Sequence, residues 1–272
     1  MLLIFYMLIC LFTSTVLYCV YLPSPNNWFY VLWVICGILT MLVMFVALLG
    51  LNLLIFRFTK PTNRLKQSIL WHYVDFILIF LKVKIEVEGT ENIPDDPVII
   101  YGNHKSMLDP VMLFYVYRMY HKSTLSAVGK STLNKVGFMH FLMNAMGAIS
   151  INRENDREAA KEMINGIKKI RETKMGYIIF PEGGIKTRET EEMVEVKPGA
   201  YKLATKAGAS ISPVSIIGSS KFNHLNKFKA NRCKIIIHKP ILEDEYKNLN
   251  TQELGEKVFE IVNAGVRDGR EE

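Results

Sequence analysis

The stretch VIIYGNHKSMLDPVMLFYVY, residues 98–117, has the pattern of a buried strand that leads through a polar loop into a helix. Residues 98–101 form a short apolar run of the kind found in fully buried strands. Asp109 precedes Pro110 and the apolar residues 111–117, where the N-cap of a helix and a proline at its first position are expected. A strand followed directly by a helix is the repeating unit of α/β sheets.

The same alternation continues on both sides of this stretch. Residues 83–88 alternate between apolar and polar, as in a half-buried strand, and further strands are predicted at residues 124–128, 148–152, 177–180, 211–217 and 233–238. Amphipathic helices are predicted at residues 156–172, 198–206 and 251–266, with Gly208 ending the second of them. The sequence therefore predicts an α/β fold, with a mainly parallel or mixed sheet of about seven strands flanked by helices. Pro213 indicates an edge strand or a bulge.

The N-terminal part of the chain has the composition of a membrane anchor. Residues 2–22 and 28–56 carry no charged side chain, and each run is long enough to cross a bilayer. The basic cluster Arg57, Lys60, Arg64 and Lys66 follows, which places the remainder of the chain on the cytoplasmic side. A cleaved signal peptide is rejected because the chain lacks a basic start.

The predicted organisation has three parts. Residues 1–66 form an anchor with two candidate transmembrane helices, residues 67–82 an interfacial helix, and residues 83–272 the α/β domain. The apolar segment 68–81 is equally compatible with a helix in the core of the domain. We expect an integral protein of the cell membrane whose α/β domain faces the cytoplasm.

Charge and cysteine usage narrow the partners and the compartment. The chain has a net charge of +7, and residues 196–242 contain no acid but many lysines, which favours anionic lipid, phosphate or an acidic carrier as partner and leaves nucleic acid open. The four cysteines form no CxxC pair, which indicates a reducing compartment.

Polar clusters follow three of the predicted strands: residues 103–109, Arg153, and residues 181–184. The carboxyl ends of parallel strands share one crevice, so these groups are expected to meet there. His104 and Asp109 lie five positions apart, too far around a helix for a direct contact, so a turn must join them. Asp109 then either holds one nitrogen of the His104 imidazole or is only a helix cap.

Two other chemistries fit these residues less well. Ser106 suggests a serine hydrolase, but the chain has no GxSxG elbow and Ser106 is close to His104 in sequence. A metal site built from His104, Asp109 and Glu182 lacks an HExxH motif and a second nearby histidine.

Four blocks resemble the glycerolipid acyltransferase family, which includes the 1-acylglycerol-3-phosphate acyltransferases. The blocks are residues 103–109 (NHKSMLD), 147–153 (GAISINR), 180–183 (FPEG) and 209–214 (ASISPV), and they occur in the order that the family has. The third block departs from the usual pattern, because Gly184 and Ile185 stand where Thr and Arg are customary.

The resemblance implies transfer of a fatty acyl group from a thioester to the sn-2 hydroxyl of 1-acylglycerol 3-phosphate in phospholipid biosynthesis. His104 would be the general base and Asp109 would orient it. The implied substrate-binding residues are Arg153, Glu182, Gly183, Lys186 and Arg188. Lys186 or Arg188 would replace the missing arginine, and Glu182 would mainly order its loop.

No metal or cofactor is expected, and the co-substrate would be acyl-CoA or acyl carrier protein. Membrane lipids are the other expected partners, and no nucleic acid is expected. The alternatives are acylation of another lysolipid or of glycerol 3-phosphate, a membrane lipid hydrolase, and a membrane-binding module without activity.

Overall fold

The computed structural model describes residues 27–94, 97–120, 124–132, 137–152, 155–224 and 230–271. The chain divides into two compact units, Met1–His72 and Tyr73–Glu272. The helices are α2 (Asn27–Phe58), α3 (Arg64–Phe80), α4 (Asp109–Tyr120), α5 (Gly137–Met146), α6 (Asp156–Thr173), α7 (Lys202–Ala207), α8 (Glu243–Tyr246) and α9 (Thr251–Glu271). Short 3-10 helices are η1 (Thr90–Asn92), η3 (Pro198–Tyr201) and η4 (Ser219–His224).

The first unit contains α2 and the beginning of α3. Lys66 is 1% exposed. Its ammonium donates to the carbonyl of Phe56 at 2.8 Å and to that of Thr59 at 3.0 Å, so it caps the C-terminal end of α2. Of the basic cluster, Lys66 is thus buried, and it satisfies helix carbonyls that would otherwise lack donors.

The predicted membrane spans fall in this unit. The first, residues 2–22, lies outside the described residues, and residues 28–56 lie within α2. Within the described parts of the chain, no helix has both the length and the apolar character that crossing a membrane requires. The transmembrane leader and the three-part division of the chain therefore stay predictions.

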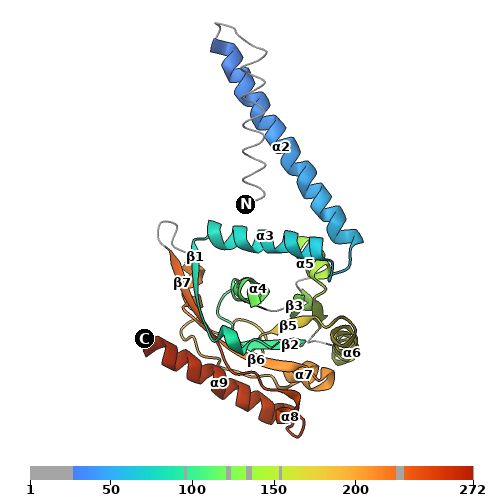
Figure 1. The fold of residues 1–272 in the computed structure, drawn as a ribbon, viewed down its shortest axis with the longest axis vertical. Coiled ribbons are helices and arrows are strands. Elements are labelled where there is room, and N and C mark those ends of the chain that lie inside the picture. The colour runs from blue at the N-terminus through green and yellow to red at the C-terminus, as the bar shows by residue number, and fades with distance from the viewer. Residues whose placement is uncertain are drawn as a thin grey trace. The chain divides into compact units, whose positions relative to one another are not determined.

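The second unit is built on one seven-stranded sheet (Figure 1). Its strands are β1 (Val83–Glu88), β2 (Val98–Gly102), β3 (Leu125–Lys130), β4 (Ile149–Ile151), β5 (Gly176–Ile179), β6 (Ser210–Ile217) and β7 (Asn231–Ile237). They lie in the order β1-β7-β6-β2-β5-β3-β4. Every pairing is parallel except that of β6 with β7. The predicted mixed α/β sheet of seven strands is confirmed.

Of the two alternatives at Pro213, the edge strand is wrong, because β6 lies between β7 and β2. The bulge fits the register, since Val214 pairs with Ile237 whereas Ile211 pairs with Ile241, one residue further along the partner segment than regular pairing gives. The ladder between β6 and β7 begins only at Val214. Pro213 contributes its carbonyl, which accepts from the backbone N–H of His238 at 3.0 Å. The missing N–H of the proline therefore breaks no pair in the β7 ladder, which explains how a central strand accommodates it.

Two apolar layers cover the sheet. Side chains from one face, such as Ile99 and Ile211, pack with α6, α7 and α9. Side chains from the other face, such as Ile100 and Val214, pack with α4. Figure 1 shows α4 on one side of the sheet and α7 and α9 on the other. The near-continuous burial of β2, β5 and β6 follows from this cover on both faces.

Parallel pairing brings the loops that follow β2, β4, β5 and β6 to the same edge of the sheet. Gly102 at the end of β2 lies beside Val214 of β6, and Tyr101 lies beside Ile179 of β5. The loop after β2 carries His104 and the loop after β5 carries Glu182. The sheet topology thus brings together two of the three predicted polar clusters, residues 103–109 and 181–184, whereas Arg153 lies outside the described residues.

We predict that acid destabilises the second unit through His238, which lies against α9. Its Nε2 is 2.8 Å from the Ser215 hydroxyl, which donates to the carbonyl of Val262 at 2.6 Å and so accepts from the imidazole. Burial lowers the pKa of His238 below its ordinary 6.5, although Asp268 opposes the shift. As the pH falls through about 6.5 the unfolded chain binds a proton here that the folded chain does not, so the free energy of unfolding decreases.

The measurement is the melting temperature of wild type and His238→Gln at about pH 7.5 and about pH 5.5. Glutamine keeps an N–H donor for Ser215 but does not titrate. Wild type should lose more thermal stability on acidification than the variant. Equal losses in the two proteins would contradict the assignment to His238.

Candidate active site

His104 and Asp109 lie in the loop between β2 and α4, and the two side chains are in contact. The imidazole Nδ1 is 3.0 Å from Oδ2 of Asp109. The same oxygen accepts from the backbone N–H groups of Lys105 at 2.7 Å and Ser106 at 2.8 Å. One carboxylate oxygen therefore closes the turn that the spacing of five residues required.

The interpretation of Asp109 as a helix cap alone is wrong. α4 begins at Asp109 itself, and the carbonyl of Leu108 accepts the first helical N–H, from Met112, at 2.9 Å. The carboxylate points back to residues before the helix, because the donors of the turn and the imidazole are arranged around it. Pro110 is consequently the second helical residue rather than the first.

The contact with Asp109 fixes the tautomer of His104. An ionised carboxylate only accepts hydrogen bonds, so Nδ1 donates to Asp109, and the neutral form of the imidazole has its lone pair on Nε2. The imidazole stacks on the ring of Phe180, with ring centroids 4.1 Å apart and planes inclined by 15°. Its side chain is 14% exposed whereas that of Asp109 is fully buried, so the arrangement offers a base to a group arriving from solution.

Glu182 lies beneath this loop and is fully buried. Its Oε1 accepts from the backbone N–H of His104 at 2.8 Å. Its Oε2 pairs with the ammonium of Lys105 at 3.1 Å and accepts from the N–H of Val194 at 3.5 Å. These contacts agree with the ordering role expected for Glu182, since donors of the protein itself occupy both oxygens.

The loop after β5, residues 180–197, is held from three directions that the sequence did not indicate. Asn103 donates to the carbonyls of Glu191 and Ile216, both at 2.7 Å, and accepts from the N–H of Ile216 at 2.8 Å. The Glu191 carboxylate accepts from the hydroxyl and the N–H of Ser220. Asn103 stands in the first block, so its residue type was visible, but its partners are more than eighty residues away.

The far end of the chain supplies the third anchor. Asn263 of α9 accepts from the N–H of Met193 at 2.8 Å and donates to the carbonyl of the same residue at 3.0 Å. Both polar atoms of the asparagine side chain are thus used on one backbone position. The periodicity of α9 marks Asn263 only as a polar residue in a buried row, which is why sequence reasoning missed it.

The three cations predicted to bind the substrate, Arg153, Lys186 and Arg188, differ in their surroundings. Arg153 lies outside the described residues. Lys186 pairs with Glu195 at 2.9 Å and lowers the pKa of that carboxyl, mainly through their hydrogen bond. Arg188 donates from Nε to the carbonyl of Lys105 at 3.2 Å, so its backbone contact is with the His104 loop.

The turn after Phe180 depends on glycine. Gly183 has φ 79° and Gly184 has φ 148°, backbone conformations that residues other than glycine rarely adopt. A Cβ added to Gly184 would have no heavy atom within 4 Å, so the backbone there borders open space. The backbone conformation, and not a lack of space, therefore favours glycine at position 184.

Neither Ser106 nor Cys233 has the environment of a nucleophile. The hydroxyl of Ser106 accepts from the N–H of Leu108 at 3.2 Å, and Ser106 is 5% exposed. Burial raises the pKa of the Cys233 thiol well above its usual range, with Asp109 and Glu191 adding to the effect. In the described ranges, no three His, Cys, Asp or Glu side chains form a group that could hold a metal ion.

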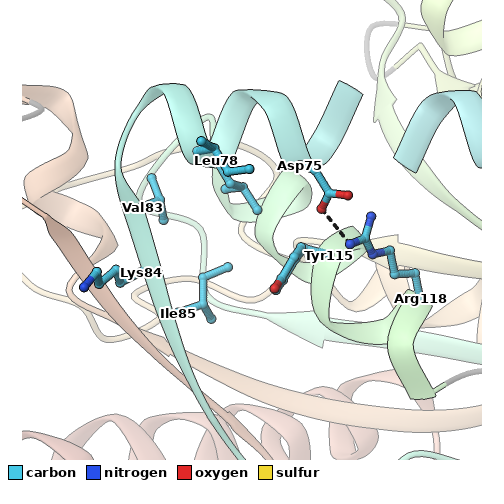
Figure 2. Close-up of a pocket in the computed structure, with 8 residues that line it drawn as sticks. Asp75, Leu78, Val83, Lys84, Ile85, Tyr115 and Arg118 are labelled. Atoms are coloured by element: carbon cyan, nitrogen blue, oxygen red, sulfur yellow. Dashed lines mark hydrogen bonds and ion pairs between the residues drawn. The ribbon is translucent and has the colours of Figure 1, made fainter. Parts of the chain in front are cut away.

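A cavity of about 390 Å³ lies away from His104, between α3, β1 and α4. Figure 2 shows its lining, which includes Leu78, Val83, Tyr115 and the ion pair of Asp75 with Arg118 at 2.6 Å. Arg118 is nine residues after Asp109, roughly 14 Å along the axis of α4. None of the predicted site residues lines this cavity.

Comparison with known proteins agrees with this geometry. The acyltransferase family model matches residues 84–217, a range that begins in β1 and ends with β6. The chain is 34% identical over 167 residues to the 1-acyl-sn-glycerol-3-phosphate acyltransferase of Borreliella burgdorferi. Residues 84–217 therefore match the acyltransferase family.

The match to the Borreliella acyltransferase covers 61% of this chain and 64% of that protein, less than two thirds of its length. The acyltransferase of the same name from Haemophilus influenzae is 28% identical over 84% of this chain and 91% of its own. Among solved structures, the 1-acyl-sn-glycerophosphate acyltransferase of Thermotoga maritima superposes with a TM-score of 0.64. It is 21% identical and the match covers 81% of this chain and 88% of the other, which supports the fold.

We predict that Asp109→Asn separates the charge of Asp109 from its role in the turn. The amide oxygen can still accept from Lys105, Ser106 and His104, so the melting temperature should stay near that of wild type. A neutral amide does not stabilise an imidazolium, so kcat should fall about 10²- to 10⁴-fold. Asp109→Ala removes three acceptor contacts and should lower both kcat and the melting temperature. An Asp109→Asn variant with wild-type kcat would show that the carboxylate acts only on the turn.

Proposed function

We propose that this protein transfers a fatty acyl group from an acyl thioester to the sn-2 hydroxyl of 1-acyl-sn-glycerol 3-phosphate, forming phosphatidic acid. The observation that carries the proposal is the contact of His104 Nδ1 with the Asp109 carboxylate, in a region that matches the acyltransferase family. The names of the relatives support the choice of acceptor. The donor is acyl-CoA or acyl carrier protein, and no further cofactor enters the reaction.

The chemistry requires one base and no covalent enzyme intermediate. Nε2 of His104 takes the proton of the acceptor hydroxyl while that oxygen attacks the thioester carbonyl. The imidazolium that forms is stabilised by the carboxylate of Asp109, 3.0 Å from Nδ1. Collapse of the tetrahedral intermediate breaks the carbon–sulfur bond, and the departing thiolate receives the proton from Nε2. The buried thiol of Cys233 takes no part.

Cations bind the phosphate of the acceptor in this proposal. Arg188 is favoured because its Nε holds the carbonyl of Lys105, next to His104, and its remaining N–H groups can bind phosphate oxygens in pairs. Arg153, from the loop after β4, is a second ligand in the proposal. Lys186 has a smaller part, because Glu195 already neutralises it. Gly183 lets the backbone approach the substrate.

Residues 1–66 hold the protein in the cell membrane in this proposal, with the α/β domain on the cytoplasmic side. Large apolar side chains of α2 are exposed, among them Ile38, Leu42, Val46 and Leu54. Exposed apolar surface of this extent needs a cover, and lipid is the solvent in which both the acceptor and the product reside. The second half of α3, with Ile79 and Phe80 each 72% exposed, is proposed to lie at the same interface.

The activity test uses the full chain in mixed micelles with radiolabelled 1-acyl-sn-glycerol 3-phosphate, with and without an acyl thioester. Wild type should form phosphatidic acid only with the thioester, and His104→Ala should be slower by about 10²- to 10⁴-fold while remaining folded. Release of free fatty acid without transfer would identify a hydrolase instead. Faster acylation of glycerol 3-phosphate or of a lysolipid with a larger head group would replace the proposed acceptor.

The phosphate site is tested by Arg188→Ala and Lys186→Ala. Arg188→Ala should raise the KM for the acceptor about 10-fold or more, because it removes charge-assisted hydrogen bonds, and should leave the KM for the thioester nearly constant. Lys186→Ala should have the smaller effect, since its ammonium is already paired. If neither variant changes the acceptor KM, the phosphate is bound elsewhere, for example by Lys197, Lys202 and Lys206.

A further inference from the structure

Lys105 follows His104 directly and contacts three different site residues through three different groups. Its backbone N–H donates to Oδ2 of Asp109 at 2.7 Å. Its ammonium pairs with Oε2 of Glu182 at 3.1 Å. Its carbonyl accepts from Nε of Arg188 at 3.2 Å. Lys105 therefore connects the loop after β2 both with the first residue of α4 and with the loop after β5.

The ion pair of Lys105 with Glu182 is fully removed from solvent, since each side chain is 0% exposed. Burying a lysine and a glutamate costs desolvation that their attraction offsets only with good geometry, and apolar residues of similar size often stabilise a fold as well or better. Stability alone therefore does not explain the pair. Its position does suggest a reason, because it ties the loop after β2 to the loop after β5 at the residue that follows His104.

The other oxygen of Glu182 links this pair to His104. Oε1 accepts from the backbone N–H of His104 at 2.8 Å, so the carboxylate that binds the Lys105 ammonium also holds the backbone of the base. Phe180, from the same loop as Glu182, stacks on the imidazole ring. The backbone and the ring of His104 are thus both set by the loop to which Lys105 is tied.

We infer that Lys105 is a positioning residue for the general base: its buried ion pair with Glu182 fixes His104 against the loop after β5. It touches neither the acceptor nor the donor and works through Glu182 and the His104 backbone. Base catalysis is sensitive to displacement of the base, and a shift of about 1 Å costs up to about 100-fold in rate. The kinetic consequence rests on the proposed function, whereas the fixed geometry does not.

The test compares Lys105→Met, Glu182→Gln and the double variant, in the full chain, with Lys234→Met as the matched control. Lys234 pairs with Glu88 at 2.9 Å and its side chain is 14% exposed, so the control also removes a largely buried lysine from an ion pair with glutamate.

Each single variant leaves one buried charge without its partner and should lose thermal stability. The double variant leaves none, and the amide oxygen introduced by Glu182→Gln still accepts from the His104 N–H. Its melting temperature should therefore lie within about 4 °C of wild type.

The double variant should nevertheless have a kcat about 10- to 100-fold below wild type, with the KM of acceptor and thioester changed less than about threefold. Lys105→Arg keeps a cation for Glu182, so its kcat should lie between those of the double variant and wild type. The control, Lys234→Met, should have the kcat of wild type. A stable double variant with wild-type kcat would overturn the inference, as would an equal loss in the control. Rates that simply follow the melting temperature across the set would also overturn it.

A second readout needs no substrate. The proton on Nδ1 of His104, hydrogen-bonded to Asp109, should give a downfield proton resonance that is absent from His104→Gln. This resonance should broaden or vanish in the double variant and persist in the control. An unchanged resonance in the double variant would contradict the positioning role. If wild type acylates no acceptor, the proposed function fails, but the resonance still decides whether Lys105 positions His104.

Discussion

The site depends on one constraint, the parallel pairing of β2 with β5 and β6. Parallel strands end on the same edge of a sheet, so the loops that carry His104 and Glu182 lie side by side although 78 positions separate them. Both neighbours of β2 are buried on both faces, which leaves the strand no freedom to shift its register. Every contact of the base with the loop after β5 follows from that register.

Two buried carboxylates in this site have separate tasks because their surroundings differ. Asp109 has backbone donors and an imidazole on one oxygen, so in the proposed reaction its charge acts on His104. Glu182 has an ammonium on one oxygen and the base's backbone N–H on the other, so its charge is neutralised locally and its geometry acts on the loop. The residue type alone does not distinguish these tasks; the partners do.

Much of the fold could be read from the sequence because its signals are local. The period of two in β1, the apolar runs of β2 and β5, and Gly208 in the left-handed conformation at the end of α7 each depend on neighbouring residues only. The His104–Asp109 contact was also predictable, since the two residues are only five positions apart and one turn of the chain brings them together. The expectation of an edge strand at Pro213 failed because the pairing of neighbouring strands decides which backbone N–H groups must donate hydrogen bonds.

What the sequence did not reveal rests on partners that are distant along the chain. The buried ion pair of Lys105 with Glu182 and the hydrogen bond of Lys66 to the carbonyl of Phe56 at the end of α2 had no signal in the sequence. Asn103 gave no sign of its bonds to residues 191 and 216. Buried polar groups of this kind are placed by the tertiary fold, which pattern and propensity do not encode.

The two hydrogen bonds between Asn263 and the backbone of Met193 affect when the loop after β5 can become ordered during synthesis. Ribosomes release the chain from its N-terminus, and β1 to β7 all precede α9. One anchor of the loop after β5 lies on α9, with both hydrogen bonds of Asn263 going to a single residue, Met193. A nascent chain therefore lacks this anchor of the loop after β5 until α9 has been synthesised and has docked.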